Sequence, residues 1–181
     1  MTINTPKKTN NQALFDPSLI IIPISQNSKI PSIKDWQNAE SLNPSDYDNK
    51  NLGIVTGIRS KILVFDADLK ENSQSINQLE DYLDAHGVDT NKLIIVSTPS
   101  GGRHYYFSYP DSCPLIPTIT EAEFKILGVR VQADGGRYVV CPPSTINSVS
   151  YEYLNTNTLE DISRTLELPP SILADILAIK K

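Results

Sequence analysis

A short run in the first half of the chain sets the strongest limit on its fold. In Lys61–Lys70, four apolar residues lead directly into Asp66 and Asp68, which predicts a buried strand that ends in two carboxylates. Alternate residues of a strand point to the same face, so the carboxylates should lie side by side. Such a pair suits Mg²⁺ or Mn²⁺ and could hold a metal-bound triphosphate for phosphoryl or nucleotidyl transfer. The alternative is that both acids simply begin a surface loop.

Other apolar or alternating runs predict the remaining strands, and they cover residues 19–24, 51–57, 93–98, 105–109, 129–133, 137–141 and 151–154. Short turn-like segments separate three neighbouring pairs of runs, which predicts three β-hairpins. The pairs are 51–57 with 62–65, 93–98 with 105–109, and 129–133 with 137–141. Alternation over residues 129–134 places the three apolar side chains on the core face and Arg130, Gln132 and Asp134 on the open face.

Helical patterns appear in two places. Apolar residues at three-to-four spacing predict a helix over residues 73–86, and a helical pattern resumes from Thr158, with a last amphipathic helix from Ser171. We therefore expect a mobile N-terminal tail at 1–17, a main domain at 18–155 and a C-terminal helical appendage at 156–181.

Composition narrows the class of protein. A chain of 181 residues with 39% hydrophobic content can bury a core of one domain. The net charge of −5 argues against a general polyanion binder, so any contact with nucleic acid must use a local basic patch. Cys113, Cys141 and two histidines exclude a four-cysteine zinc site and leave other zinc sites poorly supplied. Apolar runs stay below the roughly 18 residues of a membrane span, so we expect a cytoplasmic protein without a membrane partner.

The segment before the aromatic strand is richer in chemistry than a turn requires. Ser100 offers a hydroxyl, while Gly101 and Gly102 let a backbone approach a ligand closely. Arg103 and His104 add one fixed and one switchable positive charge. This combination predicts a phosphate-binding loop. A plain hairpin with an exposed histidine is the open alternative.

A loop near the N-terminus carries Lys29, Lys34 and the only tryptophan, Trp36. One interpretation is that Lys29 or Lys34 faces a phosphate. The other is that Trp36 fills the core while both lysines stay solvated.

Four motifs follow one another along the chain: NLGIVTG at 51–57, VFDAD at 64–68, TPSGGRHYYF at 98–107 and DGGRYVVCPPS at 134–144. Together with KIP at 29–31 and Trp36, they resemble the prim-pol domain, the N-terminal bifunctional primase/polymerase module of the archaeo-eukaryotic primase superfamily. The resemblance covers about residues 18–155. It implies an α+β fold of the archaeo-eukaryotic primase kind, with an open RRM-like mixed β-sheet, helices on one face and an N-terminal α/β unit.

The resemblance also implies a function. Such a domain is a DNA primase/polymerase that transfers nucleotides from (d)NTPs to a 3′-hydroxyl on a single-stranded DNA template, in the replication of a plasmid, phage or mobile element. A separate helicase is a possible partner. By position, Asp66, Asp68 and His104 would be catalytic, with Mg²⁺ or Mn²⁺ held by Asp66 and Asp68. The nucleotide-binding set implied for this chain is Lys29, Ser100, Gly101, Gly102, Arg103, His104 and Arg130.

One position departs from the family pattern. Arg130 stands where the family has a third acid, and a guanidinium repels a metal rather than binding it. Asp134 lies on the same predicted face, but four strand residues span roughly 13 Å, so it could be a metal ligand only through a bulge or a shift.

Three explanations of this departure remain open: Asp134 substitutes through altered geometry, two acids suffice with weaker activity, or catalysis has been lost. The alternatives to a primase/polymerase are therefore a degraded module that binds nucleotide or single-stranded DNA, and a metal-dependent phosphoesterase or nuclease that uses the same carboxylates.

Overall fold

The computed structural model describes residues 15–43, 49–111, 115–120, 122–134 and 136–179. The strands are β1 (Ile21–Ile24), β2 (Asn51–Val55), β3 (Ile62–Ala67), β4 (Ile94–Ser97), β5 (Arg103–Ser108), β6 (Val129–Gln132), β7 (Tyr138–Cys141), β8 (Thr145–Ile146), β9 (Val149–Ser150) and β10 (Glu152–Tyr153). The helices are α1 (Ser75–Ala85) and α2 (Pro170–Ile179), with short 3-10 turns η1 (Trp36–Asn38), η3 (Thr90–Lys92) and η4 (Ile162–Arg164).

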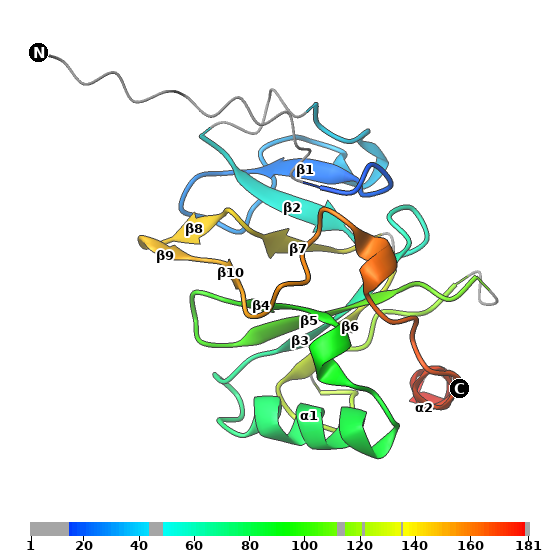
Figure 1. Cartoon of the computed structure of the whole chain (residues 1–181). Helices are drawn as coiled ribbons and strands as arrows, with labels where there is room; N and C mark the ends of the chain where they lie inside the picture. Colours follow the sequence, from blue (N-terminus) through cyan, green and yellow to red (C-terminus); the bar gives the residue numbers. More distant parts are fainter. Residues whose placement is uncertain (1–14, 44–48, 112–114, 121, 135, 180–181) are drawn as a thin grey trace, which may run out of the picture.

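The strands form two main sheets, which lie in separate layers (Figure 1). One has three strands in the order β1-β2-β7, and the other has five in the order β10-β4-β5-β3-β6. A small β8–β9 ribbon stands apart. Among the described residues, the ladders of these sheets are antiparallel, and the one parallel contact is the bridge between Ser108 and Glu167. The α+β class is confirmed. Of the predicted mixture of parallel and antiparallel pairing, the parallel part is limited to that bridge.

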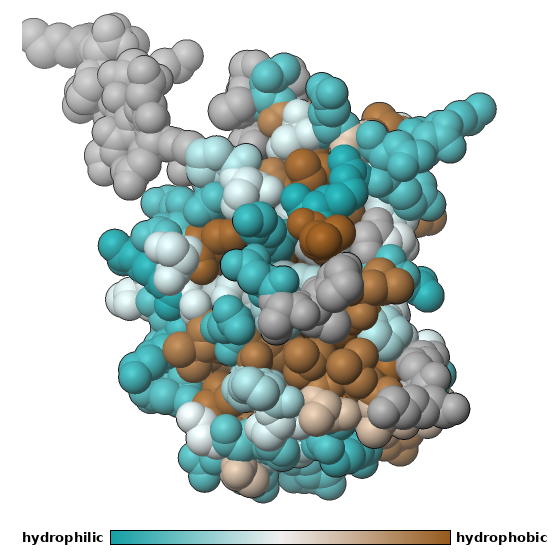
Figure 2. Space-filling model, turned by 90° about the vertical axis from the view of Figure 1, so that its right-hand side faces the viewer, coloured by the Kyte–Doolittle hydropathy of each residue, from teal (hydrophilic) through white to brown (hydrophobic). Residues whose placement is uncertain are grey.

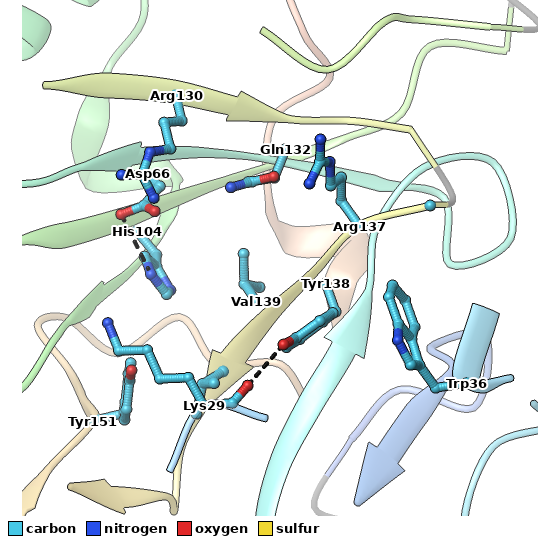
Figure 3. A pocket seen from close by; sticks show the side chains of 12 residues that line it. Lys29, Trp36, Asp66, His104, Arg130, Gln132, Arg137, Tyr138, Val139 and Tyr151 are labelled. Carbon is cyan, nitrogen blue, oxygen red and sulfur yellow. Dashed lines mark hydrogen bonds and ion pairs between the residues drawn. The ribbon is translucent and has the colours of Figure 1, made fainter. Parts of the chain in front are cut away.

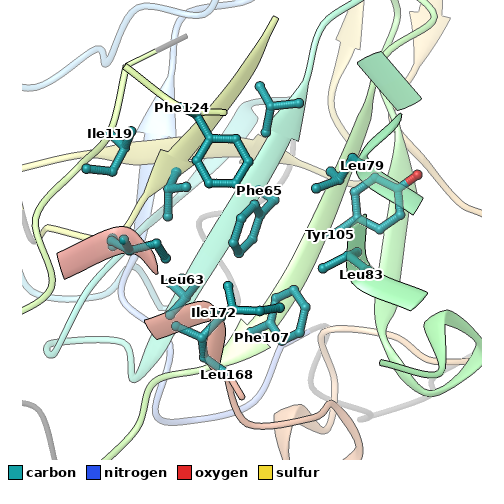
Figure 4. Close-up of a cluster of buried hydrophobic side chains, with 14 of the residues drawn as sticks. Leu63, Phe65, Leu79, Leu83, Tyr105, Phe107, Ile119, Phe124, Leu168 and Ile172 are labelled. Atoms are coloured by element: carbon teal, nitrogen blue, oxygen red, sulfur yellow. The ribbon is translucent and has the colours of Figure 1, made fainter. Parts of the chain in front are cut away.

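The five-stranded sheet separates two hydrophobic cores, because side chains alternate along its strands. Leu63 and Phe65 of β3 pack with Leu79 of α1 and Ile172 of α2 (Figure 4). Val64, the residue between them, packs instead with the three-stranded sheet. The domain therefore has three layers, with the helices on one face of the central sheet and the second sheet on the other.

Two of the three predicted hairpins are wrong. β2 and β7 belong to the three-stranded sheet, while β3 and β6, their expected partners, belong to the five-stranded sheet. A single bridge between Gly57 and Ile62 is what remains of the first hairpin. The β4–β5 hairpin is confirmed, with Ile94 opposite Tyr106 and Ser97 opposite Arg103. Alternation indicates which face a side chain takes but not which sheet a strand joins, and a turn can equally carry the chain between layers.

The expected tail and appendage are partly built into the domain. Phe15 is buried, and the Asp16 N–H donates to the Leu159 carbonyl at 2.7 Å. Residues 1–14 and Cys113 lie outside the described residues. The pattern from Thr158 gives the short turn η4 and then α2, and Ile172 joins the core on the helix face.

The C-terminal helix is only partly covered. α2 buries Ile172 and Ile176 but leaves Leu173 and Leu177 half-exposed, and the face in Figure 2 shows apolar side chains gathered in its lower half. Among the described residues, none of the helices is long and apolar enough to span a membrane.

Phe65→Ala tests the core on the helix face. Phe65 is fully buried and its ring meets those of Phe107 and Phe124 edge-on, at centroid distances of 5.5 and 5.7 Å. We expect a loss of about 3–5 kcal/mol in the free energy of unfolding, measured by urea denaturation. Leu127→Ala, at a side chain that is 55% exposed, is the control and should change it by less than about 0.5 kcal/mol. Equal losses in the two variants would contradict this view of the core.

Candidate functional site

Three polar side chains form a row across the central sheet. Asp66 of β3 is directly opposite His104 of β5 on one side and Arg130 of β6 on the other. Directly paired residues of neighbouring strands project to the same face. That face is the one towards the three-stranded sheet, because Val64 and Tyr106, two residues along, pack into the core between the sheets. The expected open face of residues 129–134 is confirmed by the buried and half-buried alternation of β6.

A pocket of about 250 Å³ opens over this row. Its other walls come from the loop before η1 and from β7 (Figure 3). The lining residues are Lys29, Trp36, Asp66, His104, Arg130, Gln132, Gly136, Arg137, Tyr138, Val139, Val140 and Tyr151. The site is thus shared between the two sheets.

Contacts with β7 and β2–β3 hold the loop in place. The Tyr138 hydroxyl donates to the Lys29 carbonyl at 2.7 Å, and the Trp36 ring meets the Tyr138 ring edge-on at 4.7 Å. The Arg59 guanidinium donates to the carbonyls of Gln37 and Ala39, just after Trp36. These bonds position Lys29 beside the pocket although the residue itself is exposed.

Positive charge dominates the pocket. Lys29, Arg130 and Arg137 line it, against the single carboxylate of Asp66. Within the described part of the chain, the side chains of Lys29 and Arg137 make no hydrogen bond or ion pair. In a protein with a net charge of −5, this local excess of cations is suited to an anion.

His104 lies at the floor of the pocket and is 6% exposed. Its Nε2 is 3.6 Å from Asp66 Oδ1, while its buried Nδ1 has no partner among the described residues. Burial lowers the pKa of the imidazole below its usual range; Asp66 and Asp68 oppose this shift and Lys29 adds to it. A neutral imidazole follows near pH 7, with one N–H to donate.

Asp68 is near the site but does not line the pocket. Its Oδ1 accepts the N–H of Lys70 at 3.0 Å, which turns the carboxylate towards the following loop. Its charge is nevertheless close enough to act on His104.

The described residues do not form the predicted metal centre. Asp134 is exposed, and its Oδ1 accepts the Gly136 N–H at 3.1 Å. Among the described residues, no three histidine, cysteine or acidic side chains come together as a metal-binding group. Asp66 is the one carboxylate of the pocket wall, and Arg130, which carries a permanent positive charge, is directly opposite it. This donor set does not fit a divalent cation held by protein ligands.

The predicted phosphate-binding loop is a tight turn beside the pocket rather than part of its wall. The Gly101 N–H donates to the Thr98 carbonyl, and Gly101 has a φ of +87°. The Ser100 hydroxyl lies 3.1 Å from that of Thr98. Gly102 is buried against β3, where an added Cβ would meet the carbonyl of Ala67 at 2.4 Å.

Arg103 lies on the opposite face of the sheet from His104. Its Nη1 donates to Glu80 of α1 at 2.7 Å, and the Tyr105 hydroxyl donates to the same carboxylate oxygen at 2.7 Å. The predicted phosphate contact would need the guanidinium on the pocket side. The structure thus brings together Lys29, Asp66, His104 and Arg130, and leaves Arg103 with the helices.

Several pocket residues carried no assignment from the sequence. Arg137 and Tyr138 follow the glycine pair at the start of β7, and Tyr151 precedes β10. The one available signal was the cation beside a glycine turn, since such turns let a ligand approach. Tyr151 gave none, because its contact with the His104 ring, at a centroid distance of 5.9 Å, joins segments 47 positions apart.

Comparison with known protein families identifies a match for this chain. The family model described as bifunctional DNA primase/polymerase, N-terminal, matches residues 12–171, which is most of the chain. No curated protein matches it.

Gly102→Ala tests the packing of the turn on β3. Because the added methyl group would lie 2.4 Å from the Ala67 carbonyl oxygen, the strands must move apart, and we expect about 1–3 kcal/mol less stability by urea denaturation. Gly136→Ala is the matched control, since its methyl group meets nothing nearer than 3.9 Å. A Gly102→Ala variant as stable as the control would contradict the close approach.

The lowered pKa of His104 predicts a dependence of stability on pH. As the pH falls below about 6.5, His104 binds a proton in the unfolded chain but stays neutral in the folded protein, because its pKa is lowered there. The free energy of unfolding therefore decreases towards acid, by up to about 1.4 kcal/mol per pH unit. His104→Gln should lack this part of the slope. Urea denaturation of both proteins from about pH 7.5 to about pH 5 measures it, and identical slopes would show that His104 titrates as it does in the unfolded chain.

Proposed function

The chain belongs to the family of bifunctional DNA primase/polymerase N-terminal domains, and on this basis we propose that its pocket binds a nucleoside triphosphate for template-directed nucleotidyl transfer to a 3′-hydroxyl. Membership supports a DNA primase/polymerase type of function in general. We further propose that the template is single-stranded DNA, that the residues of the pocket form the site, and that the protein acts in the replication of a plasmid, phage or mobile element.

The excess of cations in the pocket carries this proposal. Lys29, Arg130 and Arg137 surround one carboxylate, and a triphosphate is the most strongly charged part of a primase substrate. One guanidinium group can donate two parallel hydrogen bonds to two phosphate oxygens, whereas the ammonium group of a lysine acts as a point charge. A buried neutral His104 adds one N–H donor at the floor.

Enzymes of this family typically use divalent metal ions. The cations of the pocket support the proposal of nucleotide binding. The assays below contain Mg²⁺ or Mn²⁺, and no step is assigned to either ion.

Lys29→Met tests the proposal. With primed or unprimed single-stranded DNA, labelled nucleotides and Mn²⁺ or Mg²⁺, the wild type should give extended or de novo products on gels. Loss of one charge-assisted contact should raise the KM for nucleotide about tenfold. Lys34→Met is the matched control, because Lys34 lies exposed on the same loop but outside the pocket.

The background is set by a protein with Asp66→Ala and Asp68→Ala together. Wild-type product no greater than this background would overturn the claim of transfer. Equal KM values for the two lysine variants would overturn the assignment of the pocket.

A second candidate is a module that binds nucleotide or single-stranded DNA without transfer. The position of Arg130 opposite Asp66 favours it, because a guanidinium there opposes the metal on which transfer in this family depends. This candidate predicts Lys29-dependent nucleotide binding together with product no greater than the background.

A further inference from the structure

Arg130 sits where a divalent cation would be expected to act. It is directly opposite Asp66 across β3 and β6, on the same face as His104, and it lines the pocket. Its guanidinium is a positively charged group with hydrogen-bond donors only and no acceptor. The centre of the row therefore has a built-in positive charge beside its carboxylate.

The acids that would compete for a metal are turned away or absent from the wall. Asp68 accepts the Lys70 N–H, and Asp134 accepts the Gly136 N–H, so each carboxylate has a local backbone partner. Of the three acids Asp66, Asp68 and Asp134, only Asp66 lines the pocket. A cation between Asp66 and Arg130 would gain one carboxylate and meet one like charge.

The same charges favour a bare polyphosphate. Lys29, Arg130 and Arg137 approach from three different segments: the loop before η1, β6, and the start of β7. Three cations around one anion-binding space neutralise phosphate charge, as a bound metal would otherwise do.

We propose that Arg130, with Lys29 and Arg137, takes over the charge-neutralising role of the metal, so that this pocket binds nucleoside triphosphates without a divalent cation. The inference rests on the proposed function for the nature of the ligand. In this proposal, nucleotide binding depends on the three cations and not on a divalent metal ion. The proposal makes no claim about whether nucleotidyl transfer needs a metal ion.

Trp36 provides a direct readout, because it is the only tryptophan and it lines the pocket. The full chain is titrated with dATP and, separately, with inorganic tripolyphosphate, in EDTA and in Mg²⁺, while tryptophan fluorescence is followed. We expect Kd values for dATP in the two conditions to agree within about threefold. Arg130→Gln should weaken binding in EDTA at least about tenfold.

The controls separate charge at this site from charge in general. Arg164→Gln removes one positive charge from η4, outside the pocket, and should leave Kd unchanged. Arg137→Gln, at an exposed side chain whose loss threatens folding least, should weaken binding in EDTA by several-fold. Arg130→Asp should make binding depend on Mg²⁺.

Each outcome decides one claim. Binding by the wild type that requires Mg²⁺ and ignores Arg130→Gln overturns the inference and leaves the proposed function standing. Absence of dATP binding in both conditions overturns the proposed function as well. Tripolyphosphate that competes with dATP in EDTA supports the phosphate assignment, and failure to compete overturns it.

Discussion

Strand β3 is buried on both faces and paired along both edges, and the rest of the domain depends on this. Its alternate side chains enter two different cores, one under the helices and one under the second sheet. Asp66 is its first residue that is not fully buried. The strand thereby holds a carboxylate where the layer between the sheets opens into the pocket, with its neighbours fixed by register rather than by loop geometry.

The sequence contained the faces of the strands but not their partners. Alternation over residues 129–134 places Arg130 on the open face, and the motifs single out Asp66 and His104, which the structure brings into the same pocket as Arg130. The pairing of β2 with β7 joins segments that are more than 80 positions apart, and no local pattern encodes it. The two wrong hairpins share this cause, because each assumed that strands adjacent in sequence are adjacent in a sheet.

Arg103 shows a different failure, one that strand geometry itself could have prevented. Neighbouring residues of a strand point to opposite faces, so Arg103 and His104 of β5 could not both face a ligand. Glu80, which accepts hydrogen bonds from Arg103 and Tyr105, belongs to α1, and the periodicity that predicts this helix does not indicate which strand the helix packs against. Its role became visible only when α1 was placed against β5.

The division of the pocket between two sheets has a consequence for the domain as a whole. Lys29 and Arg137 lie on the side of the three-stranded sheet, and Arg130 belongs to the five-stranded sheet. An anion bound by all three would therefore link the two layers. A ligand that binds only the folded state adds about 2.7 kcal/mol at a hundred times its Kd. If the anion is a nucleotide, the resistance of the domain to unfolding and proteolysis would then increase with the nucleotide concentration in the cell. This stabilisation would not depend on any nucleotidyl transfer by the domain.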